Sequence, residues 1–193
     1  MCEKKFLILF GPSGSGKSVV KEYLENRGFN KLVSDTSRKI RDYAGEIEDI
    51  SYHFKTKEEF LDGIKNNKYI EFTNYSGEFY GVSKEEFENA IKENKSICHV
   101  MDAKGVKYLK SNYPNDVVTV FLIAPKNELA KRMNERGDSP KSIDVRLSTY
   151  DDEIKNSIYA DEVIENSQLE LTFSKIDYVV SKYFGGDTDG IYR

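Results

Sequence analysis

The sequence feature that most constrains the fold is a glycine-rich segment, residues 11–18, that reads Gly-Pro-Ser-Gly-Ser-Gly-Lys-Ser. It fits the pattern G-x-x-x-x-G-K-[ST], and its flanks fit as well. The short apolar run from Lys5 to Phe10 predicts a buried strand before it, and Lys17 to Arg27, closed by Gly28, predicts a helix after it. Glycines let successive backbone N–H groups converge on phosphate oxygens, and the helix N-terminus adds a favourable potential. The segment therefore predicts a phosphate-binding loop.

Each side chain of this loop has an expected task in binding a nucleoside triphosphate. We expect Lys17 to reach the β and γ phosphates and the Ser18 hydroxyl to bind Mg²⁺. The remaining loop residues are expected to contact the same nucleotide, ATP or GTP: Gly11, Pro12, Ser13, Gly14, Ser15 and Gly16. The alternative is a plain glycine turn with an exposed lysine, and the complete pattern with the right flanks argues against it.

Further strand and helix signals alternate along the chain. Apolar runs at 96–101 and 117–123 predict central parallel strands, and residues 162–165 are expected to form a last short strand. Helices are expected at 127–136, from Ser139-Pro140 to about Ser157, and at the C-terminal end, where apolar residues recur with helical spacing. Strands alternating with helices imply an α/β fold, a parallel sheet with helices on both faces.

Residues 35–95 interrupt this scheme and look like an insertion. A short strand is expected at Leu32 to Ser34, just before it. Within it, the runs 69–75 and 78–82 flank Ser76-Gly77, which is a hairpin signal. Capping boxes beginning at Thr56 and Ser83 predict the start of two polar helices.

Composition excludes several functions. The net charge is −4, from 29 basic and 33 acidic side chains, whereas a general nucleic-acid binder usually carries the opposite balance. The opening apolar run, Phe6 to Phe10, is too short to span a membrane, so we expect no membrane partner and a cytoplasmic location. Cys2 and Cys98 form neither a disulfide framework nor a metal-ligand pattern.

A basic cluster marks the start of the insertion. Ser34, Arg38 and Arg41 lie within eight residues, and arginine offers a planar fork of donors that pairs with phosphate oxygens. The hydroxyls of Tyr52 and Tyr80 could reach the same phosphate. Taken alone, such a run could equally be an ordinary solvated loop.

Several further motifs, in unbroken order over about residues 4 to 185, resemble the guanylate kinase family. Besides the phosphate loop they are Ser37-Arg38-x-x-Arg41, Gly45-Glu46, Tyr52-His53-Phe54, Tyr69-Ile70-Glu71-Phe72, Gly77-Glu78-Phe79-Tyr80-Gly81, Asp102-x-x-Gly105-Val106, Ile123-Ala124-Pro125, Arg132-Met133-x-x-Arg136-Gly137, Arg146-Leu147 and Val163-Ile164-x-Asn166. The resemblance implies a three-layer P-loop NTPase fold with a core domain of residues 1–34 and 96–193. It also implies an inserted α+β lobe for GMP at 35–95 and a helical lid at about 127–157.

The resemblance also implies the site residues. Ser34, Arg38, Arg41, Tyr52 and Tyr80 match positions that hold the GMP phosphate, while Glu71 and Asp102 match positions that read guanine, whose N1 and N2 are donors suited to carboxylates. The catalytic residues implied are Lys17, Arg38, Arg132, Arg136 and Arg146. Asn166 matches the residue that recognises adenine.

The function implied is transfer of the ATP γ-phosphoryl group to GMP, and to dGMP, by direct in-line attack with Mg²⁺. ATP and GMP would be the partners, and the protein a monomer or homodimer. Two alternatives stay open: a kinase of the same scaffold acting on another nucleoside monophosphate or a phosphosugar, and a non-catalytic binding module of the same family.

The sequence departs from the family pattern in two places. Val82 stands where a hydroxyl residue would donate to guanine O6, so Val82→Ser is expected to lower the KM for GMP. The family pattern also has two acidic residues separated by one position, followed by Gln-Gly. In this chain Val100 replaces the first acid, Asp102 remains, and Lys104 replaces the glutamine. These changes predict a relaxed or altered acceptor.

Overall fold

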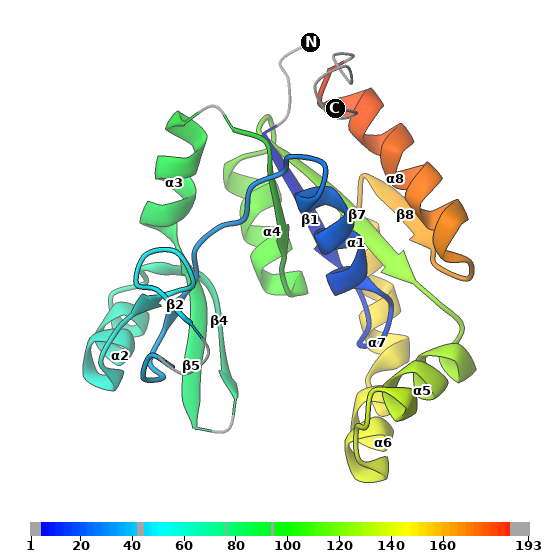
Figure 1. The fold of residues 1–193 in the computed structure, drawn as a ribbon, viewed down its shortest axis with the longest axis horizontal. Helices are drawn as coiled ribbons and strands as arrows, with labels where there is room; N and C mark the ends of the chain where they lie inside the picture. The colour runs from blue at the N-terminus through cyan, green and yellow to red at the C-terminus, as the bar shows by residue number, and fades with distance from the viewer. Residues whose placement is uncertain (1–4, 42–44, 76, 94, 186–193) are drawn as a thin grey trace. The chain divides into compact units, whose positions relative to one another are not determined.

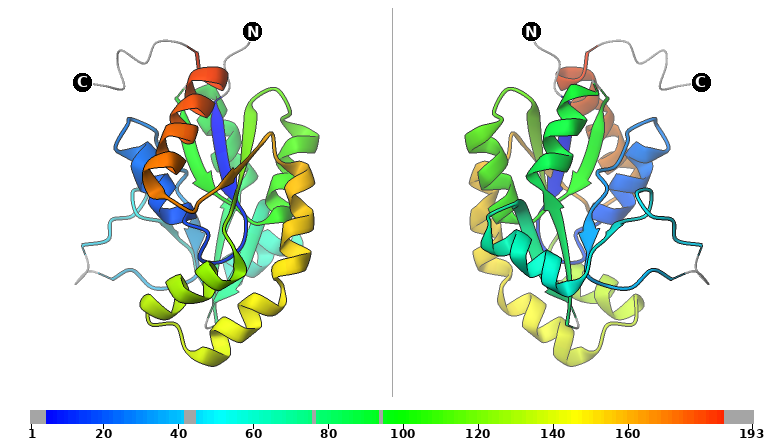
Figure 2. Two further views of the ribbon diagram at one scale, coloured as in Figure 1. Left: turned by 90° about the vertical axis from the view of Figure 1, so that its right-hand side faces the viewer. Right: turned by 90° about the vertical axis from the view of Figure 1, so that its left-hand side faces the viewer.

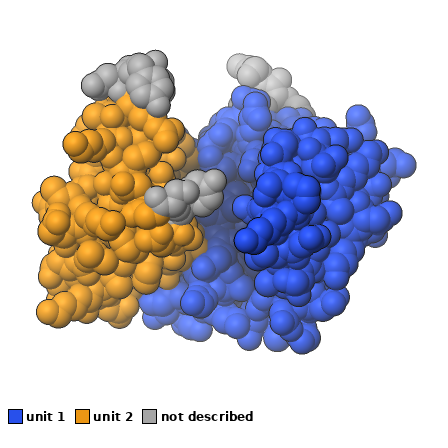
Figure 3. Space-filling model, turned by 90° about the horizontal axis from the view of Figure 1, so that it is seen from below, with its two compact units in different colours: residues 1–30, 96–193 blue, residues 31–95 orange. Residues whose placement is uncertain are grey.

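A computed structural model describes residues 5–41, 45–75, 77–93 and 95–185. The chain divides into two compact units, coloured separately in Figure 3. We call residues 1–30 and 96–193 the core unit and residues 31–95 the inserted unit.

The points where the chain leaves and re-enters the core unit are neighbours. The Asn30 N–H donates to the Ser96 carbonyl at 2.9 Å, and the Cys98 N–H donates to the Asn30 carbonyl at 2.8 Å. Asn30 thereby forms a parallel bridge with Ile97. The inserted unit therefore begins and ends at one place on the core.

The core unit is built on a parallel sheet in the order β6-β1-β7-β8. The strands are β1 (Phe6–Phe10), β6 (Ile97–Val100), β7 (Val117–Ile123) and β8 (Glu162–Glu165), as their apolar runs predict. Every residue of β1 is buried, because a central strand is covered on both faces.

Helices cover both faces of this sheet (Figures 1 and 2). On one face, Leu7 and Leu9 of β1 belong to a cluster with Val20 of α1 (Lys17–Glu25) and Ile176 of α8 (Leu169–Tyr183). On the other face, α4 (Ala103–Asn112) contacts β1 and β7. The predicted three-layer α/β fold is confirmed. Cys98 is buried with a free thiol, and Cys2 lies outside the described residues.

Helices follow one another between β7 and β8. They are α5 (Lys126–Glu135), α6 (Pro140–Ser148), α7 (Tyr150–Lys155) and the 3₁₀ turn η2 (Asn156–Tyr159). The single helix expected from Ser139-Pro140 to about Ser157 is wrong, because the chain breaks at Thr149. The Thr149 hydroxyl donates to the Arg146 carbonyl at 3.0 Å, a local bond that competes with helix continuation.

The inserted unit contains a mixed sheet in the order β3-β2-β5-β4. Its strands are β2 (Asp35–Thr36), β3 (His53–Phe54), β4 (Tyr69–Tyr75) and β5 (Glu78–Ser83). The hairpin of β4 and β5 is confirmed, although Ser76 of its turn lies outside the described residues. The strand expected at Leu32 to Ser34 is wrong, because the Val33 N–H is bonded to the Glu86 carboxylate at 2.8 Å and pairing starts only at Asp35.

Two helices, α2 (Lys57–Lys65) and α3 (Lys84–Lys92), accompany this sheet. The capping box at Thr56 is complete. At α3, the Ser83 hydroxyl accepts from the Glu86 N–H, which is the first half of the predicted capping box. The Glu86 carboxylate accepts from the Val33 N–H instead of the Ser83 N–H, so the box is incomplete. Phe60 of α2 stacks on the ring of Tyr69 at 4.4 Å, which forms the centre of the unit's own core.

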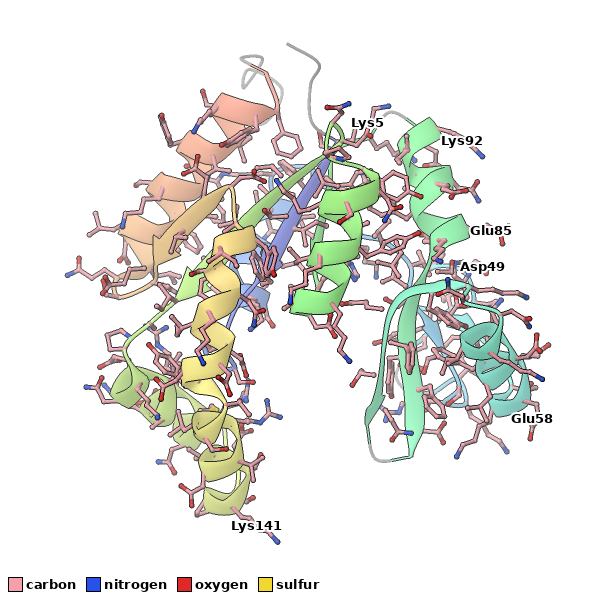
Figure 4. The ribbon with its side chains drawn as sticks, turned by 180° about the vertical axis from the view of Figure 1, so that it is seen from behind. Lys5, Asp49, Glu58, Glu85, Lys92 and Lys141 are labelled. Carbon is pink, nitrogen blue, oxygen red and sulfur yellow. The ribbon has the colours of Figure 1, made fainter. Side chains whose placement is uncertain are left out.

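Charged side chains point outward from both units, for example Glu85 and Lys92 on α3 and Lys141 on α6 (Figure 4). In the part of the chain that the structure describes, no helix is both long and apolar enough to cross a membrane.

Candidate active site

The phosphate-binding loop follows β1 and leads into α1, as the sequence predicts. Its glycines Gly11, Gly14 and Gly16 have φ values of +129°, +81° and +94°, in a region that other residues rarely adopt. A Cβ atom on Gly11 would lie 2.2 Å from the Leu122 carbonyl oxygen. Glycine is therefore required here both for the turn and for close packing against β7.

Lys17 lies at the first turn of α1 with its amine folded back over the loop. Its Nζ donates to the carbonyl oxygens of Gly11 at 2.6 Å and Pro12 at 2.7 Å. Burial lowers the pKa of Lys17 to about 8, although the nearby Glu153 carboxylate opposes this shift. The amine is thus poised where the loop would receive phosphate oxygens.

A cavity of about 350 Å³ adjoins the loop within the core unit. Its walls include Gly11, Asp102, Lys104 and Glu153. Asp102 caps α4, because its Oδ1 accepts from the N–H groups of Lys104 and Gly105, each at 2.8 Å. Asp102 was expected at this place from the sequence, whereas no motif pointed to Glu153 of α7, whose carboxylate is close enough to Lys17 to act on its pKa.

The arginines of the expected lid have different partners. The Arg146 guanidinium donates to the Ser13 hydroxyl of the loop at 2.7 Å. Arg132 donates to the Asn166 carbonyl at 2.8 Å, and Arg136 pairs with Asp138. Arg136 and Arg146 are both close enough to Lys17 to lower its pKa. These helices thus bring positive charge to the edge of the loop.

Asn166 lies directly under the phosphate-binding loop. Its side chain is 4% exposed and donates to the Ser15 carbonyl at 2.9 Å. Its Oδ1 accepts from the Thr172 hydroxyl at 2.9 Å. Adenine recognition by Asn166 stays a prediction, and no sequence motif pointed to Thr172, a buried polar residue of α8.

Three of the residues predicted to hold the acceptor phosphate lie close together in the inserted unit. The Arg38 guanidinium lies 5.6 Å from the centre of the Tyr52 ring, which is 6.0 Å from that of Tyr80. Arg38 is held by the Glu46 carboxylate through two bonds of 3.0 and 2.7 Å, which raise the pKa of Arg38. The same carboxylate accepts from the Arg41 N–H at 2.8 Å. Glu46 therefore organises both arginine positions.

Ser34 and Glu71 are the two other predicted site residues of the inserted unit. Ser34 precedes β2, and its carbonyl accepts from the His53 N–H at 3.0 Å. Glu71 of β4 lies opposite Val82 of β5, and Thr73 lies opposite Tyr80. Because side chains two residues apart share a face of a strand, Glu71, Val82 and Tyr80 face the same side of this sheet.

Val82 is 1% exposed. Ser83, the nearest hydroxyl along the strand, lies opposite Tyr69 and caps α3. Because Ser83 directly follows Val82 in the strand, its side chain belongs to the other face of β5.

The core unit has three α/β layers around a parallel sheet, a phosphate loop after its first strand, and arginines close to that loop. These features define a P-loop protein that binds nucleotide phosphates. The family model described as guanylate kinase matches residues 3–183. The guanylate kinase of Wolinella succinogenes is 39% identical over 168 residues, which cover 85% of this chain and 77% of that protein. That of Rickettsia prowazekii is 33% identical, covering 90% of this chain and 89% of that protein.

A solved structure agrees with these matches. The crystal structure of guanylate kinase from Anaplasma phagocytophilum is similar with a TM-score of 0.67 and 29% identity, covering 97% of this chain and 89% of that chain. The chain belongs to the guanylate kinase family.

Proposed function

We propose that this protein transfers the γ-phosphoryl group of ATP to GMP, giving ADP and GDP. The observation that carries the proposal is the intact loop, with the Lys17 amine over it and Arg146 bound to Ser13, in a chain that matches the family over nearly its whole length. A binding module without catalysis would not need these groups.

The transfer itself demands positioning and charge neutralisation more than covalent chemistry from the protein. An oxygen of the GMP phosphate attacks the γ-phosphorus, and the bond to the ADP oxygen breaks. Because that attacking oxygen is already ionised, no separate general base is required. Lys17, Arg132, Arg136 and Arg146 would stabilise the charge on the transferred group and on the leaving oxygen.

The acceptor phosphate would be held in the inserted unit by Ser34, Arg38, Arg41, Tyr52 and Tyr80. Guanidinium groups and phenolic hydroxyls are donors, as a phosphate requires. The bond from Glu46 fixes the Arg38 fork before the acceptor binds. Glu71 and Asp102 would accept from the guanine N1 and N2 donors, which adenine cannot offer at those positions.

Mg²⁺ would accompany ATP, and its donor chemistry fits the residues present. The Ser18 hydroxyl is exposed at the first turn of α1, and Mg²⁺ prefers oxygen ligands shared with substrate phosphates. When bound, the ion would neutralise phosphate charge. Val100 removes one carboxylate that the family pattern places nearby, so Ser18 and the phosphates would provide most of the ligands.

The test is ADP release from Mg·ATP in a coupled assay with GMP, dGMP, AMP, CMP, UMP and ribose 1,5-bisphosphate as acceptors. We expect GMP to lead, with dGMP next. If another acceptor is phosphorylated faster than GMP, the protein is a kinase of the same fold with a different acceptor specificity. Wild-type protein that binds Mg·ATP but turns over none of them would favour the binding-module alternative.

A separate prediction concerns Val82. We expect Val82→Ser to lower the KM for GMP several-fold, because the wild-type side chain beside Glu71 offers no hydrogen bond to the base, and such a bond contributes about 1 kcal/mol. The readout is the ratio of kcat/KM for GMP to that for AMP. Val82→Ala, which also shortens the side chain but adds no hydroxyl, is the control. An unchanged ratio in Val82→Ser would mean that guanine selection does not involve this position.

A further inference from the structure

Asn166 and Thr172 form a small buried assembly beneath the phosphate-binding loop, which we call the loop brace. The Asn166 Nδ2 donates to the Ser15 carbonyl at 2.9 Å, and the Thr172 hydroxyl donates to the Asn166 Oδ1 at 2.9 Å. Ser15 and Thr172 are fully buried and Asn166 is 4% exposed. A Cβ atom on Gly16 would lie only 2.1 Å from Nδ2, so the amide lies directly against the loop backbone.

The orientation of the Asn166 amide follows from its partners. The Ser15 carbonyl can only accept, so it must face the NH₂ group of Asn166. The amide oxygen then faces Thr172, whose hydroxyl can donate to it. Rotating the amide by half a turn would set two acceptors against each other in a buried place, which is costly. The Ser15 carbonyl thereby decides which end of the amide faces the loop, and the Thr172 hydroxyl holds the oxygen end in place.

The backbone of Asn166 is tied down as well. Its N–H donates to the Ile123 carbonyl at the end of β7 at 2.7 Å, and its carbonyl accepts from Arg132 at 2.8 Å. One residue therefore links the central sheet, the loop and an arginine of the expected lid. Such a position suits a support better than a group that must meet an incoming base.

Holding the Ser15 carbonyl has a consequence for the loop's donors. In a planar trans peptide the C=O of one residue and the N–H of the next point in opposite directions. The bond to Asn166 therefore turns the Gly16 N–H away from the brace. Without the brace the peptide between Ser15 and Gly16 could rotate, because Gly16 lacks the side chain that would restrict it.

We propose that Asn166, oriented by Thr172, is a positioning residue that fixes the Ser15–Gly16 peptide for phosphate binding, and not a reader of the nucleotide base. The brace acts on any ligand with a polyphosphate chain, whatever its base. The inference deepens the proposed function, since its kinetic part rests on transfer to GMP, whereas its binding part needs only the loop.

The test compares a base-free ligand with ATP. Binding of inorganic tripolyphosphate and of Mg·ATP is measured by calorimetry for wild type, Thr172→Val, Thr172→Ser and Asn166→Ala, with Lys17→Met showing which binding belongs to the loop. Thr172→Val keeps the shape but removes the donor. We expect it to weaken both ligands by the same factor, roughly tenfold, while Thr172→Ser, which restores the hydroxyl, recovers most of the affinity.

A matched control removes another hydroxyl from the same helix. Ser174 is exposed, and its hydroxyl donates to the Glu170 carbonyl one turn earlier. The Thr172 hydroxyl is within reach of the equivalent carbonyl, that of Gln168, at 3.0 Å, and shares its one proton between this carbonyl and the Asn166 Oδ1. Ser174→Ala should therefore leave both affinities unchanged. Circular dichroism and thermal melts confirm that each variant is folded at the temperature used; if Thr172→Val is not, Asn166→Ala decides.

The outcomes separate the two roles of Asn166. Equal losses for tripolyphosphate and ATP in Asn166→Ala support the brace, and a fall in kcat with GMP should accompany them. A loss for ATP alone would assign Asn166 to the base and overturn the inference, as would wild-type affinities in Thr172→Val. Wild-type protein that binds both ligands but does not phosphorylate GMP would refute only the proposed function.

Discussion

Replacing Lys17 with methionine should lower kcat by about 10³-fold, the effect of removing a preorganised electrostatic group from the reacting phosphates. Methionine keeps the length and apolar character of the stem, so the loop should keep its shape. The lost amine is the one that now donates to the Gly11 and Pro12 carbonyls and would turn to the phosphates of ATP. The readout is single-turnover formation of GDP at saturating ATP.

The pH dependence checks the same group. The pKa of Lys17 in the free protein is lowered to about 8, so its amine is charged below that pH and neutral above it. Only the charged form attracts phosphate, so ATP affinity should fall about tenfold per pH unit above pH 8. Lys17→Arg stays charged and should lack this dependence. If the ATP affinity of the wild-type protein does not change between pH 7 and pH 10, the assignment is contradicted. If Lys17→Met keeps a kcat within tenfold of wild type, Lys17 takes no part in the transfer step.

Gly11→Ala should destabilise the core unit by more than about 4 kcal/mol, a large share of the stability of a typical domain. The new Cβ would lie 2.2 Å from the backbone oxygen of Leu122, in a strand that cannot yield without disturbing the sheet. The φ of +129° adds a cost that alanine cannot avoid. Urea unfolding followed by circular dichroism measures the loss.

Gly28→Ala separates the two causes. Gly28 has a φ of +90°, but nothing lies within 4 Å of the position its Cβ would take. That variant should be destabilised only by the conformational cost of the positive φ, roughly 1–2 kcal/mol. Similar losses for both variants would show that β7 can move away from the loop, contrary to the packing seen here.

The elements that the sequence predicts well are those whose burial is uniform. The β1, β6 and β7 runs are mostly apolar, with His99 and Thr119 as the polar exceptions, because parallel strands are covered on both faces, and the structure confirms them. The failures are local. The pattern gave no sign that Thr149 would bond to the Arg146 carbonyl and break a helix, or that Glu86 would take the Val33 N–H and delay the start of β2.

The candidate site was predictable where residues act within a short motif and not where distant segments meet. The phosphate loop is read from eight consecutive residues, and resemblance supplied Arg38, Tyr52 and Tyr80, which lie together in the structure. Thr172 and Glu153 carry no motif of their own. Their relation to the loop exists only after α7 and α8 have packed, so no spacing along the chain could reveal it.

The adjacency of Asn30 and Ser96 bears on how such a chain can change. Their backbone bonds close the core at the point where residues 31–95 leave it, so those residues impose no stretched connection on the sheet. A segment with adjacent ends can be shortened, lengthened or exchanged without altering the distance that the core must bridge. Joining residue 30 to residue 96 by a short turn should therefore leave the parallel sheet and the phosphate loop able to form, so the core would tolerate a change in the length of the inserted unit.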